Sequence, residues 1–133
     1  MAKAIVICDT DVIIDYWDNR NLRHNHTREI LEQTIGRENI AISAITKMEL
    51  MKGATKKSDL QKTIKNLFGF NIILLNNAIT LKAFDLLQSY SLSHNLSLPD
   101  CIIAATSIIT GYDLFTYNTK DYRYVSGLKL FAV

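Results

Sequence analysis

The alternation of short apolar runs with longer amphipathic stretches constrains the fold of this chain more than any other feature. The apolar runs are rich in β-branched residues and predict five strands, over residues 4–8, 39–43, 72–75, 114–117 and 128–131. The stretches between them have helical spacing and predict helices over residues 11–17, 27–35, 44–53, 58–68, 77–94 and 100–110. This alternation predicts an α/β fold, with helices on both faces of a parallel sheet of about five strands.

Three of these segments carry more detailed expectations. Residues 72–75 are almost all apolar, which is typical of a strand with both faces covered. In the helix over residues 77–94, Leu81, Phe84 and Leu87 share one face. The helix over residues 100–110 is apolar on all sides, and we expect it to be buried.

Length and composition fit one globular domain over residues 1–133, since 48% of the residues are hydrophobic and 21% are charged. The net charge of +2 permits a polyanionic partner without indicating one. Cys8 and Cys101 lie inside apolar runs, so we expect buried free thiols of a reducing compartment. The sequence shows neither a signal-peptide core nor a run long enough to cross a membrane, which predicts a cytoplasmic protein.

Four acidic residues fall where a parallel sheet collects its ligands. Asp9 directly follows the first predicted strand, and Asp121 follows the fourth. Asp100 begins the buried helix after Pro99, and Glu49 lies about two turns into the helix that follows the second strand. Because ligands bind at the carboxyl ends of the strands in such a sheet, we expect these four carboxylates to converge.

Each of these residues also has an ordinary structural interpretation. Asp9 can cap a helix, and Asp100 can complement the dipole of a first helical turn. Glu49 can be a solvated helix residue, and Asp121 an ordinary turn residue. No one of them indicates a site, and the hypothesis depends on all four lying at the same edge.

A cluster of four carboxylates requires positive charge, because like charges held close together disfavour ionisation. Divalent cations that prefer oxygen ligands supply it, and Mg²⁺ or Mn²⁺ suits a shell of carboxylates and water. Such a cluster is typical of phosphodiester hydrolysis, in which a metal lowers the pKa of a bound water.

Four segments in this order resemble the PIN-domain ribonucleases, and in particular the VapC toxins of toxin–antitoxin pairs: residues 5–15, 43–53, 98–105 and 115–122. The resemblance covers nearly the whole chain. It implies a Rossmann-like three-layer α/β/α sandwich and an endoribonuclease, dependent on Mg²⁺ or Mn²⁺, that cuts loops of transfer or ribosomal RNA. It also implies a homodimer and a cognate antitoxin whose tail lies along a groove leading to the acidic pocket.

The resemblance assigns roles to particular residues. Asp9 and Asp100 would be the principal metal ligands, and Glu49 and Asp121 would complete an acidic quartet. Polar side chains at three further positions would support the site by hydrogen bonding: Thr10, Thr116 and Asn118. Tyr122 stands where this family often carries Phe.

Basic and aromatic residues suggest contacts with RNA. We hypothesise that four lysines flank the pocket and bind RNA phosphates, although a solvated helix face is the alternative: Lys47, Lys52, Lys56 and Lys57. Tyr16 and Trp17 can stack an unpaired base, or can be core or dimer contacts. His24 and His26 lie in a predicted polar loop without partners, which argues against a metal site there.

Other functions fit parts of the sequence. Asp9-Thr10-Asp11 resembles the nucleophile motif of haloacid-dehalogenase phosphatases, but the paired acids that follow later in that family are missing. A metal-dependent RNA-binding module without catalysis is a second alternative. A PIN-type nuclease that matures RNA, without a toxin role, is a third.

Overall fold

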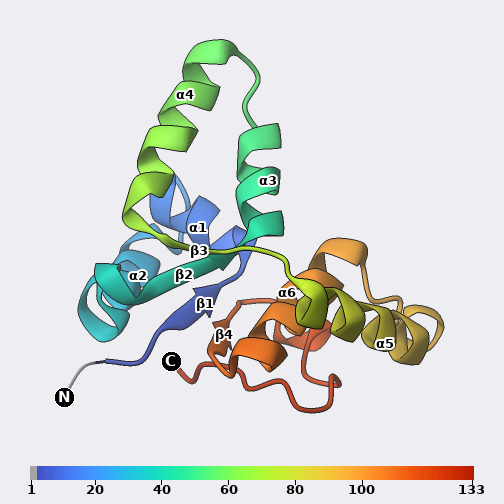
Figure 1. Ribbon diagram of the computed structural model, residues 1–133. Coiled ribbons are helices and arrows are strands. Elements are labelled where there is room, and N and C mark those ends of the chain that lie inside the picture. The colour runs from blue at the N-terminus through green and yellow to red at the C-terminus, as the bar shows by residue number, and fades with distance from the viewer. Residues whose placement is uncertain (1–2) are drawn as a thin grey trace.

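The computed structural model describes residues 3–133 and shows a parallel sheet in the order β3-β2-β1-β4 (Figure 1). The strands are β1 (Val6–Cys8), β2 (Ile40–Ser43), β3 (Asn71–Ile73) and β4 (Asp113–Phe115). In the register of the sheet, Ile7 of β1 lies between Ala41 of β2 and Leu114 of β4. The strand order reverses beside β1, so ligands are expected at the carboxyl end of that strand.

Helices connect these strands. The α-helices are α1 (Thr10–Trp17), α2 (His24–Glu29), α3 (Ala44–Lys52), α4 (Lys57–Asn66), α5 (Asn77–His94) and α6 (Leu98–Thr110). A π-helical segment continues α2 (η1, Ile30–Ile35), and three 3₁₀ turns follow along the chain: η2 (Arg37–Asn39), η3 (Leu67–Gly69) and η4 (Thr119–Asp121). In Figure 1, α3 and α4 form a hairpin that rises from the sheet, while α5 and α6 lie together on another side.

Side chains alternate between the two faces of the sheet and enter two separate cores. On one face the strands contribute to a core shared with α1 and η1: Val6, Cys8, Ile40, Ile42 and Phe115. On the other face they contribute to a core shared with α5 and α6: Ile7, Ala41 and Leu114. The predicted three-layer α/β/α sandwich is therefore confirmed.

The predicted strand over residues 128–131 is wrong, because this segment meets β4 at one residue alone. Leu130 forms an isolated parallel bridge with Leu114. The amide of Leu114 donates to the carbonyl of Lys129 (2.9 Å), and the amide of Phe131 donates to the carbonyl of Leu114 (2.8 Å). Gly127 enters this segment with φ of +85°, after a turn. Two hydrogen bonds at one residue do not make a strand, and the sheet has four strands among residues 3–133.

The apolar run at residues 72–75 does not form a covered strand either. β3 has a neighbour on one side only, and it ends at Ile73. Leu74 and Leu75 lie beyond it, with 72% and 40% of their surface exposed. Burial on both faces requires a central position in the sheet, and an apolar sequence alone does not reveal strand order.

Of the three large side chains predicted to share a face of α5, Leu87 packs against the core, whereas the other two lie outside it. Leu81 and Phe84 are 62% and 55% exposed. The buried residues of α5 are Ile79, Ala83 and Leu86. Ala83 allows α6 to approach closely, since the Cys101 thiol reaches the Ala83 carbonyl (3.2 Å). α6 is largely buried as predicted.

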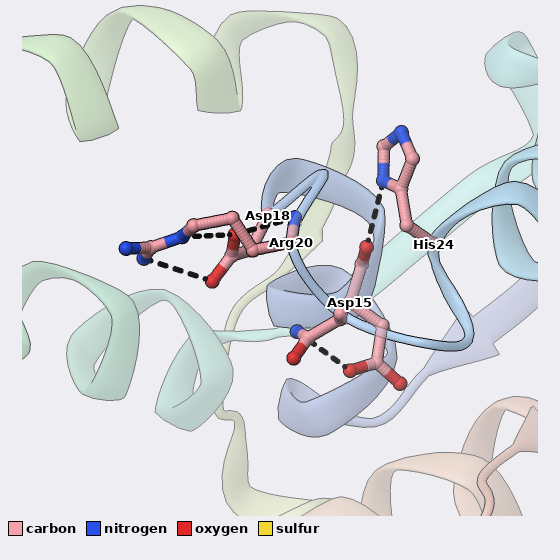
Figure 2. Close-up of polar contacts among 5 residues, drawn as sticks. Asp15, Asp18, Arg20 and His24 are labelled. Atoms are coloured by element: carbon pink, nitrogen blue, oxygen red, sulfur yellow. Dashed lines mark hydrogen bonds and ion pairs between the residues drawn. The ribbon is translucent and has the colours of Figure 1, made fainter.

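A polar network fixes the connection between α1 and α2 (Figure 2). His24 lies in the first turn of α2, not in a polar loop, and its Nδ1 donates to the carbonyl of Asp15 (3.0 Å). The Asp15 carboxylate is buried, accepts from Asn21 Nδ2 (3.0 Å), and pairs with Arg23 Nε (2.9 Å). The same guanidinium lies over the ring of Tyr117, 4.1 Å from its centroid. The connection is therefore tied to the segment that follows β4.

Cys8 and Cys101 are buried free thiols, as predicted. Within residues 3–133, no helix has both the length and the apolar character needed to cross a membrane.

Candidate functional site

Asp9 occupies the carboxyl end of the central strand and is 5% exposed. Its Oδ1 accepts from the backbone amide of Thr10 (2.8 Å), which caps α1. Its Oδ2 accepts from the hydroxyl of Thr116 (2.8 Å), which directly follows β4. Asp9 is therefore both a helix cap and a buried carboxylate between two strand ends, and the two interpretations of it are compatible.

Asp100 lies beside Asp9, and one hydroxyl connects them. Asp100 is in the first turn of α6, which is capped by the Ser97 side chain at the amide of Asp100 (3.3 Å). The hydroxyl of Tyr122 donates to Asp100 Oδ1 (2.9 Å) and lies 3.5 Å from Asp9 Oδ1. Tyr122 is fully buried, and burial raises the pKa of its phenol well above the usual range. The phenol thus stays a hydrogen-bond donor between the two carboxylates.

Glu49 joins the same edge through Thr10. Ser43 caps α3 at the end of β2, so this helix leaves the sheet at the carboxyl edge. The hydroxyl of Thr10 donates to Glu49 Oε1 (2.7 Å) and lies 3.0 Å from the hydroxyl of Thr46, which is buried. Thr10 therefore holds Asp9 with its amide and Glu49 with its side chain, as expected of a supporting residue.

Asp121 is exposed on the 3₁₀ turn after β4. Burial raises the pKa of Asp100, and the charge of Asp121 adds to that effect. Asn118 also forms hydrogen bonds at this edge: its side-chain amide donates to Asp11 (2.7 Å), which is not one of the four predicted acids, and its backbone amide donates to the Thr116 hydroxyl (3.0 Å). Asp11 is thus a fifth carboxylate at this edge, and sequence reasoning missed it. The available signal was its place in the first turn of α1, two residues after Asp9.

Burial and like charge make this edge electrostatically unfavourable without a cation. Burial raises the pKa of Asp9 to about 6; hydrogen bonds from Thr116 and Thr10 oppose this, and the charges of Asp100 and Asp11 add to it. Burial also raises the pKa of Asp100. Among residues 3–133, the ion pairs of the molecule all lie elsewhere: Arg20 with Asp18, Arg23 with Asp15, and Arg28 with Glu32. The site carries negative charge that no basic side chain in this part of the chain neutralises.

The chemistry of these donors fits a divalent cation that prefers oxygen. Asp9 and Asp100 each offer carboxylate oxygens beside the shared Tyr122 hydroxyl, and no thiol or imidazole takes part in their hydrogen bonds. Within residues 3–133, no three acidic, His or Cys side chains are gathered closely enough to enclose an ion. These residues therefore match Mg²⁺ or Mn²⁺ in two respects: they offer the oxygen ligands that these ions prefer, and their negative charge balances the charge of the ion.

The four lysines singled out in the sequence lie along the α3–α4 hairpin. Lys47 is partly buried in α3, and Lys52 is exposed at the end of that helix. Lys56 and Lys57 are exposed at the start of α4, in the turn at the far end of the hairpin in Figure 1. Lys47 and Lys52 lie on the same helix as Glu49, and Lys56 and Lys57 lie further along the hairpin.

Known proteins resemble this chain over most of its length. The PIN domain family model matches residues 6–127. Ribonuclease VapC1 of Methanocaldococcus jannaschii is 29% identical over 136 residues, which span 97% of this chain and 88% of that protein. A chain from a toxin–antitoxin complex of Klebsiella pneumoniae has a TM-score of 0.75 and 36% identity, covering 92% of this chain and 94% of that chain. VapBC-1 of nontypeable Haemophilus influenzae, at 23% identity, shares the fold with a TM-score of 0.75 and 96% of both chains covered. These matches confirm the expected resemblance.

Replacement of Tyr122 tests whether its hydroxyl organises the two carboxylates. Tyr122→Phe preserves the buried ring and removes the donor that Asp9 and Asp100 share. Loss of such an orienting hydrogen bond is expected to weaken Mn²⁺ binding about tenfold, measured by titration calorimetry. Tyr112→Phe, at the opposite edge of the sheet, is the control and should bind Mn²⁺ like the parent. Equal affinity in Tyr122→Phe and Tyr112→Phe would contradict this role.

The raised pKa of Asp9 predicts how the stability of the metal-free protein depends on pH. A carboxyl group with a folded pKa of about 6 is protonated more readily in the folded than in the unfolded chain. Stability that is present below the ordinary pKa of Asp is therefore lost as the pH rises through about 6, by on the order of 3 kcal/mol. Urea unfolding in EDTA across this range measures the loss, and Asp9→Asn should remove most of it. Parallel pH curves for the two proteins would refute the assignment.

Proposed function

This chain belongs to the PIN-domain family, and from that premise we propose that it is a metal-dependent endoribonuclease. One observation carries the proposal: Asp9 and Asp100 lie together at the carboxyl end of the central strand, linked by the Tyr122 hydroxyl. The ribonuclease activity named for the Methanocaldococcus relative supports the reaction class.

In the proposed site, Asp9 and Asp100 are the principal ligands of Mg²⁺ or Mn²⁺, and Glu49 and Asp121 complete the acidic quartet. The bound cation would supply an activated water and stabilise the charge that develops on the phosphate. The chain's own residues orient the ligands. Hydrogen bonds from Thr10 and Thr116 fix the two oxygens of Asp9 in different directions. The carboxylate oxygens that would hold the cation are therefore fixed by separate elements of the fold before a phosphodiester reaches this edge.

We propose that the substrate is a single-stranded or loop RNA, such as a loop of transfer or ribosomal RNA. The acidic edge repels phosphate groups that no cation accompanies, so the flanking phosphates need positive charge elsewhere on the surface. Exposed lysines of the α3–α4 hairpin provide it in this proposal: Lys52, Lys56 and Lys57, with Lys47 closer to the sheet.

The nuclease proposal is tested with purified protein and a panel of transfer and ribosomal RNAs. We expect site-limited cuts in Mg²⁺ or Mn²⁺, no cuts in EDTA, and at least a hundredfold loss of rate in Asp9→Asn and in Asp100→Asn. Asp113→Asn, which changes a carboxylate at the opposite end of β4, is the control and should cut normally. Cleavage that persists in Asp9→Asn, or in EDTA, would exclude this active site.

We further propose that the chain is the toxin of a toxin–antitoxin pair, acts in the cytoplasm as a homodimer, and is silenced by a cognate antitoxin. The support is the 36% identity to a chain of the Klebsiella toxin–antitoxin complex. A positively charged antitoxin side chain at the acidic edge would compete there with the metal ion and RNA. A maturation nuclease of the same fold would share the site without this regulation.

Toxicity separates these two roles. Induced expression in a bacterial host is expected to stop growth and deplete an intact RNA, and Asp9→Asn at equal protein level is expected to do neither. Light scattering of that inactive variant should give twice the mass of the 15.1 kDa chain. Normal growth with active, soluble enzyme would favour the maturation role, and a mass of one chain would reject the homodimer.

A further inference from the structure

A cavity lined by aromatic and basic side chains lies between the end of α1 and the end of α4. Its volume is about 350 Å³. Its principal lining residues are Tyr16, Trp17, Arg37, Lys65, Asn66 and Phe70. The rings of Trp17 and Phe70 are stacked, with centroids 6.1 Å apart and planes 10° from parallel. Phe70 is buried and Trp17 packs against it while staying partly exposed, so the aromatic wall joins two segments distant in the sequence.

The basic groups of this cavity are free to bind a ligand. Arg37 and Lys65 are exposed, and within residues 3–133 neither forms an ion pair. The nearby Glu32 accepts hydrogen bonds from the Tyr16 hydroxyl (2.7 Å) and from Arg28 (3.2 Å). These hydrogen bonds lower the pKa of Glu32, and the charge of Arg37 adds to that effect, although Arg37 forms no ion pair with it.

Arg37 lies against the turn at Gly69. A Cβ atom at Gly69 would be 3.4 Å from a guanidinium nitrogen, which is ordinary van der Waals contact. The guanidinium therefore lies beside the backbone that lines the cavity.

A neighbouring cavity separates this one from the candidate active site and borders both. It has a volume of about 320 Å³, shares Trp17 with the first cavity and includes Glu49 in its lining. Ile14 and Leu50 give the neighbouring cavity an apolar wall, and Asp59 adds a negative charge to it. A ligand that extends from the acidic edge through the neighbouring cavity to Trp17 would first meet carboxylates and then apolar surface. At its far end it would meet two cationic side chains beside aromatic rings.

We infer that the cavity around Trp17, Arg37 and Lys65 is a binding subsite for one nucleotide of the RNA strand, away from the bond that is cut. The inference rests on the proposed function, and it extends that function by specifying where the RNA strand leaves the active site. A nucleotide combines a flat base with an anionic phosphate, and this cavity offers a match for each: aromatic surface for stacking and two cations for phosphate. The Asn66 amide adds a donor and an acceptor for a base edge.

An acidic peptide fits these features less well. It would satisfy Arg37 and Lys65 but would make no use of the flat aromatic wall. It would also have to pass Asp59 and Glu49 in the neighbouring cavity, where carboxylates repel it. A nucleic-acid strand can turn its bases and sugars toward that section and keep its phosphates in solvent.

The position of Trp17 allows a direct test, because it is the only tryptophan of the chain. The Asp9→Asn protein in EDTA is titrated with a short uncleavable 2′-O-methyl oligoribonucleotide while tryptophan emission is followed. Saturable quenching is expected. Arg37→Gln and Lys65→Gln should each weaken binding several-fold and each lower the salt slope of log K by about one. Lys82→Gln and Lys129→Gln, which remove the same charge elsewhere, are the matched controls.

Three results would overturn the subsite. The first is affinity in Arg37→Gln and Lys65→Gln equal to that of the controls. The second is a mononucleotide that binds as tightly as the oligonucleotide, which would indicate a site for free nucleotides. The third is poly-glutamate that quenches Trp17 more effectively than the oligonucleotide, which would indicate a protein partner.

Cleavage kinetics with active protein keep this inference distinct from the proposed function. If both are correct, Arg37→Gln and Lys65→Gln raise KM for RNA and leave kcat unchanged. If these variants cleave with an unchanged KM, the nuclease stands and the subsite is rejected. If the parent protein cleaves no RNA but binds the oligonucleotide at Trp17, the nuclease is rejected and the RNA-binding cavity remains.

Discussion

The repulsion among carboxylates at the end of β1 is the constraint on which the site depends. Asp9 cannot move away from it, because its two oxygens are held by the amide of Thr10 and the hydroxyl of Thr116. Burial and the neighbouring charges of Asp100 and Asp11 then raise its pKa to about 6. The fold thus holds a carboxylate where its ionised form is disfavoured. Such local destabilisation persists only where the surrounding structure over-determines it, and it is typical of functional sites.

The two hydrophobic cores provide that surrounding structure. Alternate side chains of β1, β2 and β4 anchor opposite layers, so the central strand is clamped from both faces. The close approach of α5 and α6 at Ala83 and Cys101 fixes the helix that carries Asp100. The hydrogen bonds of Thr10 bring the start of α3 to the start of α1. The acids therefore lie on strand and helix ends whose positions are set by packing, which is what a site of defined geometry requires.

Periodicity in the sequence predicts the layers and the edge at which the acids meet, because these follow from local pattern and from the geometry of parallel strands. It does not predict strand order, so the apolar run at residues 72–75 was wrongly expected to be covered. The inward face of α5 depends on the small residue Ala83, although Leu81 and Phe84 are larger apolar residues and would be expected to be buried first. Contacts between individual side chains are harder still to predict from sequence, and no hydrophobic or acidic pattern in this chain pairs Asn118 with Asp11. Tyr122 was visible only as a departure from the family's usual Phe, and the structure gives that extra oxygen a place between two carboxylates.

The net charge of +2 conceals a separation of opposite charges that the proposed reaction can use. Carboxylates occupy the edge of the sheet, whereas free cations lie on the α3–α4 hairpin and beside Trp17. In the function proposed here, the phosphate to be cut approaches carboxylates that repel it, and a cation at the acids removes that repulsion. Phosphates on either side meet basic groups whether or not the metal is present. Metal and RNA then favour each other's binding at the acidic edge, and linkage makes that coupling reciprocal. The distant basic groups contribute affinity that is independent of the metal, so a strand can be retained before the site is complete.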